Sequence, residues 1–152
     1  MKTLCEEKLN DLVQEISITC FKKPFLHKAN YNYRLRTTGG RYVLSTHNIE
    51  INPKYILEMD KEDYIGIIKH ELCHYHLHIE GKGYKHGDED FKKLLRKVGA
   101  PRHCKPLPSQ LNREKYKYVC KKCKFIYKRI RQVNTSKYRC GKCSGKILLI
   151  EK

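Results

Sequence analysis

The stretch Lys69-His70-Glu71-Leu72-Cys73-His74 lies within a longer run, Ile65 to Ile79, that is apolar on nearly every side. On a helix, residues four apart lie on one face, so His70 and His74 direct two imidazoles to one point, with Glu71 beside them. Two imidazoles and a third protein ligand bind Zn²⁺ with one position open, and a water bound there has a pKa of about 7. Glu71 is placed to take the proton from that water. Polar side chains in an apolar helix are costly to bury unless a metal or another partner satisfies them, and we take the stretch to predict a catalytic zinc site with a general base.

A third ligand must come from outside this helix. The segment Gly81-Lys82-Gly83-Tyr84-Lys85-His86-Gly87 ends the helix at Gly81 and lets the chain turn back. His86 follows just before a new helix begins, and it is the preferred third ligand. Glu89 and Asp90 remain alternatives.

Other polar residues near the motif are expected to have supporting or structural roles. His78 lies one turn beyond His74, and we expect it to support the ligands or to pack in the core. Tyr42, Arg41 and His47 are expected at the surface or in the core rather than at the site. The pair formed by residues 103 and 104, His-Cys, is expected to belong to a connecting segment rather than to a zinc site.

These residues resemble the SprT-like metalloproteins, whose eukaryotic relatives include Spartan, the protease for DNA–protein crosslinks. The resemblance rests on the His70 to His74 motif, the glycine-bearing loop, His86-Gly87 and Phe91. It extends upstream, to the segments Arg36-Thr37-Thr38-Gly39-Gly40-Arg41-Tyr42 and Ile49-Glu50-Ile51-Asn52-Pro53, and includes the terminal cysteines. The spacing from His86 to Phe91 is one residue longer than the His-Gly-x-x-aromatic pattern of Spartan. The resemblance implies that His70, His74 and His86 bind zinc and that Glu71 is catalytic.

The remaining pattern predicts an α+β fold. A first helix is expected from the apolar residues Leu9, Leu12, Val13 and Ile16. Alternation predicts strands over 31–36 and 41–45, and a third strand over 49–52 is stopped by Pro53. Helices are expected over 61–80 and from Asp88 to Gly99. With the zinc helix, this predicts a zincin-like unit with a small antiparallel or mixed sheet, one of whose edges would bind an extended peptide by strand addition.

A second metal site is predicted near the C-terminus. Cys120 and Cys123 form one Cys-x-x-Cys pair, Cys140 and Cys143 form another, and sixteen residues separate the pairs. This spacing is typical of a four-cysteine structural zinc site, and a redox motif would need only one such pair. The aromatic segment from Phe125 to Tyr127 suggests the hairpin of a zinc ribbon.

The charge is strongly positive and concentrated at one end. The formal net charge is +17, with 39% hydrophobic and 32% charged residues. From Lys105 onward there are fifteen Lys or Arg and two acidic residues. Basic side chains interleaved with tyrosines favour nucleic acid as a partner, with phosphate contacts, stacking on unpaired bases and no sequence specificity. A ribbon that only stabilises the protein, or that binds a protein partner, is the alternative.

The N-terminus lacks the apolar core of a secretory signal, and no run reaches the length of a membrane span, so we expect a cytoplasmic protein without membrane association. Eight cysteines in a reducing compartment then serve as metal ligands or free thiols. The expected organisation is a SprT-like zincin metallopeptidase domain over 1–105, a proline-bearing linker over 106–114 and a zinc ribbon over 115–152.

The leading functional hypothesis is a zinc metallopeptidase, a hydrolase that uses one catalytic and one structural Zn²⁺ and acts on proteins associated with nucleic acid, most simply DNA. The alternative is a non-catalytic, zinc-stabilised protein that binds nucleic acid or has a regulatory role. A structural zinc site has no need of Glu71, and this favours the enzyme.

Overall fold

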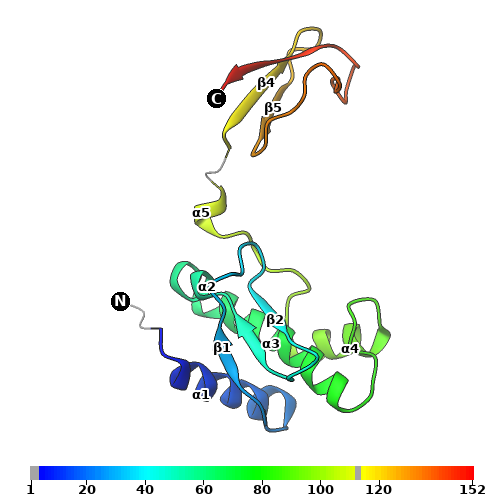
Figure 1. Ribbon diagram of the computed structural model, residues 1–152. Coiled ribbons are helices and arrows are strands. Elements are labelled where there is room, and N and C mark those ends of the chain that lie inside the picture. Colours follow the sequence, from blue (N-terminus) through cyan, green and yellow to red (C-terminus); the bar gives the residue numbers. More distant parts are fainter. Residues whose placement is uncertain (1–3, 112–113) are drawn as a thin grey trace. The chain divides into compact units, whose positions relative to one another are not determined.

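The computed structural model describes residues 4–111 and 114–152 and confirms the α+β fold class. The chain divides into two compact units, Met1–Leu107 (unit 1) and Pro108–Lys152 (unit 2) (Figure 1). Leu107 is fully buried in the core of unit 1, while the short helix α5, Pro108–Leu111, begins unit 2. The segment predicted as a linker over 106–114 therefore contains a buried residue and a helical turn.

Unit 1 is built on a three-stranded mixed sheet with the order β1-β3-β2. Strand β1 spans Ala29–Tyr31, β2 spans Gly40–Tyr42 and β3 spans Ile49–Ile51. The central strand β3 pairs in parallel with β1 and antiparallel with β2. Ile49 and Ile51 are fully buried, so the alternation of this strand directs one face of the sheet into the core.

Two of the helices of unit 1 pack against this sheet (Figure 1). Helix α1 (Glu6–Ile16) packs on β1 and continues into the π-helical turn η1 (Ser17–Phe21). Helix α2 (Pro53–Glu58) follows β3 directly, and helix α3 (Lys61–Ile79) packs against α1, β2 and β3. Helix α4 (Glu89–Val98) packs on α3 and ends at Gly99, whose φ of 68° suits glycine.

The first two strands are shorter than predicted and begin earlier in the chain, and β1 shares only Tyr31 with its predicted range. The first was expected over 31–36, but β1 ends at Tyr31 because the Asn32 side chain accepts a hydrogen bond from the Arg34 backbone N–H and turns the chain. The second was expected over 41–45, but β2 ends at Tyr42 because the His47 N–H donates to the Val43 carbonyl and closes a turn. Both strands lose their outer residues to local turns.

Unit 2 is a three-stranded antiparallel sheet with the order β5-β4-β6. Strand β4 spans Tyr116–Cys120, β5 spans Ile126–Arg129 and β6 spans Ile147–Glu151. Its small core contains two of the cysteines, Cys120 and Cys140, together with Ile147. A core this small rarely stabilises a fold unaided, which makes the cysteines the natural source of stability.

Candidate active site

Helix α3 and the loop that follows it bring three histidines together in unit 1. The Nε2 atoms of His70 and His74 lie 3.3 Å apart, and the Nε2 atom of His86 lies 3.0 Å from that of His70. The three side chains form a group able to hold a metal ion, with all ligand atoms within 4.8 Å of one another. The helical spacing brings His70 and His74 together, and the loop after α3 brings His86 to them.

The acidic residues that follow His86 fix the shape of this loop. Asp90 accepts a hydrogen bond from the Gly83 backbone N–H, at 3.1 Å, and Asp88 accepts one from the Lys85 N–H, at 3.0 Å. Glu89 forms an ion pair with Lys92 on the surface of α4. Within the described part of the chain, the metal-capable group at α3 includes neither Glu89 nor Asp90. Of the three candidates for the third position, the structure brings only His86 to the pair on α3.

The orientation of the histidine rings suits a cation. Nδ1 of His70 lies 2.8 Å from the Pro101 carbonyl oxygen, and Nδ1 of His74 lies 2.5 Å from that of Tyr84. A carbonyl oxygen only accepts, so each Nδ1 carries the proton and the Nε2 atoms of these neutral rings present lone pairs to each other. Such lone pairs repel at this separation unless a cation lies between them. Tetrahedral Zn–N bonds of about 2.05 Å would place the nitrogens about 3.3 Å apart, which matches the observed spacing.

Burial keeps these histidines in the ligating form. It lowers the pKa of His74 to about 4 and lowers the pKa of His70 as well, despite the opposing hydrogen bonds to the backbone carbonyls. Neutral imidazole is the form that binds metal ions. The hydrogen bond at Nδ1 also fixes which nitrogen is left for the metal.

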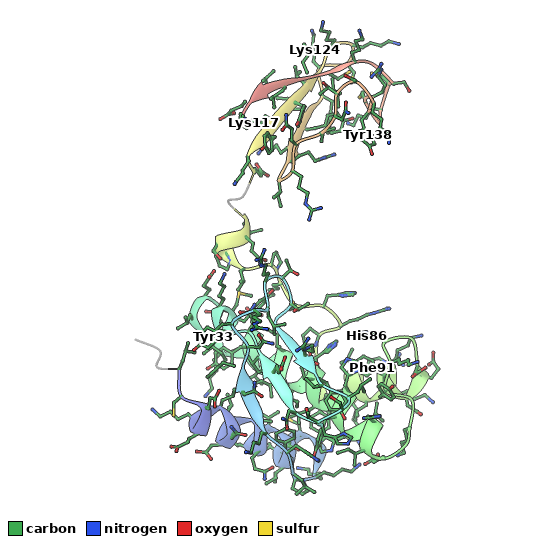
Figure 2. All side chains as sticks on the ribbon, in the orientation of Figure 1. Tyr33, His86, Phe91, Lys117, Lys124 and Tyr138 are labelled. Atoms are coloured by element: carbon green, nitrogen blue, oxygen red, sulfur yellow. The ribbon has the colours of Figure 1, made fainter. Side chains whose placement is uncertain are left out.

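Phe91 of α4 packs against all three histidines. Its ring stacks on His74 with the centroids 4.3 Å apart, and it meets His70 and His86 at 5.3 Å each. Figure 2 labels His86 and Phe91, which lie side by side. The additional residue between His86 and Phe91 is thus accommodated without separating the aromatic ring from the cluster.

Glu71 lies beside the cluster and is 7% exposed. Burial raises its pKa to about 8, while a hydrogen bond from the backbone N–H of Tyr42 acts in the opposite direction. A carboxyl group with a pKa near neutrality is suited to both accepting and returning a proton. Close packing holds the side chain, since a Cβ atom on Gly40 would lie 3.0 Å from the Glu71 Cγ.

A cleft of 540 Å³ opens over this group. Strand β2 contributes Gly40, Arg41 and Tyr42 to its lining, and α3 contributes Ile67 as well as the motif residues. Arg102, His103 and Cys104 line it from the segment after α4. The expectation that Arg41 and Tyr42 lie away from the site was wrong, because β2 is the strand that packs on α3. His103 and Cys104 also line the cleft, but they lie in the connecting segment after α4, as expected, and belong to neither metal-capable group of the described residues.

Two further contributions had weak or no signals in the sequence. The carbonyl groups of Tyr84 and Pro101 act through the backbone, so residue type does not reveal them. Tyr42 was considered, but its role depends on its backbone N–H and on the strand register that aims this group at Glu71.

The four cysteines of unit 2 also come together. Sγ of Cys120 lies 3.4 Å from that of Cys143, and Sγ of Cys123 lies 3.6 Å from that of Cys140. All four form one metal-capable group. Zn–S bonds of about 2.3 Å would place tetrahedral sulfurs about 3.8 Å apart, so the cluster suits a closed zinc site. The backbone N–H of Cys123 donates to the Cys120 sulfur, an interaction that favours the thiolate.

Unit 2 carries most of the positive charge. Residues 108–152 contain fourteen Lys or Arg and two acidic residues. The two acids are paired, Glu151 with Lys117 and Glu114 with Lys128, and lysine and arginine side chains project around the sheet (Figure 2). Phe125 and Tyr138 are 39% and 55% exposed, and the Lys142 ammonium lies 3.9 Å from the centre of the Phe125 ring. Flat rings beside cations form a surface suited to phosphates and bases.

Among the described residues, no helix is both long enough and apolar enough to cross a lipid bilayer.

Several known proteins are similar to this chain. Protein SprT-like of Oceanobacillus iheyensis is 61% identical over 147 residues, covering 97% of this chain and 98% of the relative. Protein SprT-like of Bacillus subtilis is 57% identical over 142 residues, covering 93% of this chain and 95% of the relative. Among solved structures, the metallopeptidase zymogen of Pyrococcus abyssi abylysin is similar, with a TM-score of 0.46 and 19% identity, over 61% of this chain and 81% of that one. The sequence profile of the SprT-like family matches residues 9–117, and the chain belongs to the SprT-like family.

Proposed function

We propose that the chain is a zinc-dependent metallopeptidase of the SprT-like type that cleaves proteins associated with nucleic acid. One observation carries the proposal: three histidine Nε2 atoms converge at the floor of an open cleft, with the buried carboxyl group of Glu71 beside them. A closed structural site has no use for an adjacent buried acid. The mixed sheet with this helix against it also supports a zincin-like fold for unit 1.

The chemistry follows from these positions. Zn²⁺ held by His70, His74 and His86 would lower the pKa of a coordinated water and polarise a peptide carbonyl. Glu71 accepts the proton of the attacking water and delivers it to the leaving amine. The Tyr42 backbone N–H and the packing at Gly40 hold the carboxyl group in place for both transfers.

Strand β2 is suited to bind the substrate backbone. It lies at the edge of the sheet. Two hydrogen bonds show which of its residues face β3: the Asn52 N–H donates to the Gly39 carbonyl, and the Val43 N–H donates to the Asn48 carbonyl. In this pairing Arg41 faces β3, so the N–H and carbonyl of Gly40 and the carbonyl of Tyr42 face the other way, as does the Tyr42 N–H that interacts with Glu71. Gly40 and Tyr42 both line the cleft. An extended peptide would add to this edge, with its scissile bond above the histidines.

Unit 2 serves as the nucleic-acid-binding part in this proposal. The four cysteines hold a second, structural Zn²⁺, and the basic surface around them binds the sugar-phosphate backbone, most simply of DNA, without reading sequence. Connecting this unit to the peptidase raises the effective concentration of the cleft near proteins bound to the same polynucleotide.

The test is to incubate purified protein with a DNA-binding protein, crosslinked to DNA or free, and to compare wild type with Glu71→Gln. Cleavage is expected with wild type alone, faster for the crosslinked substrate and lost on chelation. Cleavage of free and crosslinked protein at equal rates would remove the nucleic-acid part of the proposal. Nucleic-acid binding without any cleavage would favour a non-catalytic module.

A further inference from the structure

His78 belongs to a row of aromatic residues that extends from the zinc helix, and the proposed chemistry does not use it. It lies one turn beyond His74 on α3. Its Nδ1 is 2.7 Å from the Tyr42 hydroxyl, which is also 2.7 Å from Nδ1 of His47. Its ring lies between two tyrosines, with centroids 5.6 Å from Tyr42 and 4.6 Å from Tyr84.

Each of these two tyrosines holds a different part of the candidate active site through its backbone. The Tyr42 backbone interacts with the carboxyl group of Glu71 and opposes the rise of its pKa, and the Tyr84 carbonyl accepts the Nδ1–H of His74 at 2.5 Å. His78 contacts the side chains of both. A continuous path therefore runs from Glu71 through Tyr42, His78 and Tyr84 to His74.

The elements that carry the two tyrosines need such support. Strand β2 is an edge strand of three residues that ends at Tyr42, so few ladder bonds hold it to β3. Tyr84 lies in the glycine-bearing loop between α3 and α4. Both are attached through His78 to the last turn of α3, the helix that also carries the motif.

The Tyr42 hydroxyl can satisfy both histidines at once. It has one proton to donate, and it accepts a second hydrogen bond, so one of His47 and His78 carries its proton on Nδ1 and the other does not. Burial raises the pKa of Tyr42 to about 12, which keeps that proton in place. The histidines in this row of aromatic residues do not form a further metal-capable group among the described residues.

We infer that His78 is a positioning residue of the proposed peptidase, fixing Glu71 through the Tyr42 hydrogen bond and His74 through the ring of Tyr84. The inference rests on the proposed function for its effect on turnover, but its effect on the metal is independent of cleavage. Partners of metal ligands typically contribute 10- to 100-fold to metal affinity or activity.

Two substitutions of His78 separate its connection to Glu71 from its connection to His74. His78→Phe keeps a ring between the tyrosines and removes Nδ1, so we expect kcat to fall about tenfold with little change in KM, and zinc affinity to stay near wild type. Tyr42→Phe removes the hydrogen bond to His78 and also the one to His47, so it should lose at least as much, and the double variant should be no worse than Tyr42→Phe, because the side chains of His78 and Tyr42 share one hydrogen bond. His78→Asn keeps a polar group near Nδ1 and removes the ring, so zinc affinity at the histidine site should fall about tenfold.

The measurements use the full-length, metal-loaded protein. Chelator competition gives the affinity, and the visible spectrum of cobalt in the histidine site reports its geometry, which should change in His78→Asn. His27→Phe is the matched control, because His27 lies in the same row but bonds to the Tyr75 hydroxyl at 2.8 Å instead. Thermal unfolding of each variant separates positioning from loss of the fold.

Wild-type kcat in both His78→Phe and Tyr42→Phe would overturn the connection to Glu71. A wild-type cobalt spectrum and zinc affinity in His78→Asn would overturn the connection to His74, as would equal losses in His27→Phe. If wild type cleaves no substrate, the proposed function fails, and the spectrum and affinity alone decide the role of His78.

Discussion

Single hydrogen bonds decide which ring nitrogen carries the proton in three histidines of helix α3. The Pro101 and Tyr84 carbonyls accept hydrogen bonds from the Nδ1–H groups of His70 and His74, which leaves Nε2 of each ring for a metal. In His76, two residues from His74, the proton is on the other ring nitrogen, Nε2. Its Nε2 lies 2.8 Å from the Ser17 hydroxyl, which itself donates to the Lys23 carbonyl, so His76 must be the donor. Neighbouring histidines on one helix thus belong to a candidate metal site and to the core.

The metal sites predict separate losses of zinc. His86→Ala removes one of three ligands from the open site and should leave one zinc per chain, in the cysteine cluster. Cys120→Ser removes a ligand of the closed site, so this variant should lose the zinc of the cysteine cluster and keep the zinc of the histidine site. Metal analysis of purified wild type, which we expect to contain two zinc ions, and of both variants checks this. A full complement of zinc in either variant would refute that assignment.

The buried His76 predicts a loss of stability in acid. It is 5% exposed, and burial lowers its pKa to about 4 from 6.5. Between these values the unfolded chain binds a proton that the folded chain excludes, so the free energy of unfolding decreases as the pH falls from 6.5 towards 4. His76→Gln should make this decrease shallower, as measured by urea unfolding at several pH values. The exposed His103→Gln is the control, and an equal pH dependence in wild type and His76→Gln would contradict the assignment.

At the scale of elements, the site depends on how closely β2 approaches α3. A Cβ atom at Gly40 would lie 3.0 Å from Glu71 Cγ, 3.1 Å from Ile67 Cγ2 and 3.2 Å from the Glu50 carbonyl oxygen. Two of these neighbours lie in the core or its backbone and have little room to move. The strand that is proposed to bind substrate is therefore also the strand that confines the proposed base.

Gly40→Ala should lower kcat at least tenfold, because the methyl group displaces either the strand or the Glu71 side chain. Gly87→Ala is a stringent control, since it adjoins His86 yet its added Cβ meets no atom within 4 Å. Peptidase assays with zinc content measured in parallel provide the test. Equal activity in both variants would show that the close approach at Gly40 does not matter.

Much at this scale was predictable from local sequence. The apolar run predicted α3 within one residue at its end, and the spacing of Phe91, Leu95 and Val98 predicted α4. Helix α2 was missed although a signal was present: Pro53 was treated as the end of a strand, but it is the first residue of a helix whose cap is Asn52, which accepts the Lys54 N–H. The π-helical turn η1 had no comparable signal.

Some features of the candidate site were likewise predictable from local sequence, and others were not. Histidines four apart and paired Cys-x-x-Cys motifs have fixed local geometry, and the structure brings these residues together as the spacing suggested. The position of Tyr42 follows from the pairing of β2 with β3 and its packing on α3, and the carbonyls of Tyr84 and Pro101 depend on two loop conformations. Tertiary contacts of this kind are not encoded in any one segment.

At the scale of the whole molecule, charge is divided unequally. Residues 1–107 carry a formal net charge of +5, and residues 108–152 carry +12. Bound Zn²⁺ with four thiolates would reduce the second value by about two and leave unit 2 strongly basic. The division of charge therefore follows the division into compact units.

A fragment ending at Leu107 should keep the histidine zinc site and its fold, because the core residues of unit 1 lie within it. It should lose most nucleic-acid binding. Binding by the full chain should fall at least tenfold between 50 and 200 mM salt, with single strands preferred where aromatic rings stack on bases. Titration of labelled single-stranded and duplex DNA and RNA tests this. Undiminished binding by the fragment would assign the nucleic-acid surface to unit 1 instead.

The role of Glu71 as the base is tested most directly by zinc-loaded Glu71→Gln. The amide has nearly the shape of the carboxyl group but cannot accept the proton of the attacking water, and it leaves all three histidines in place. We predict that this variant binds as much zinc as wild type, retains nucleic-acid binding and releases new amino termini from an unfolded protein substrate only at the background rate. Cleavage by the variant at the wild-type rate, with both zinc ions bound, would contradict the mechanism.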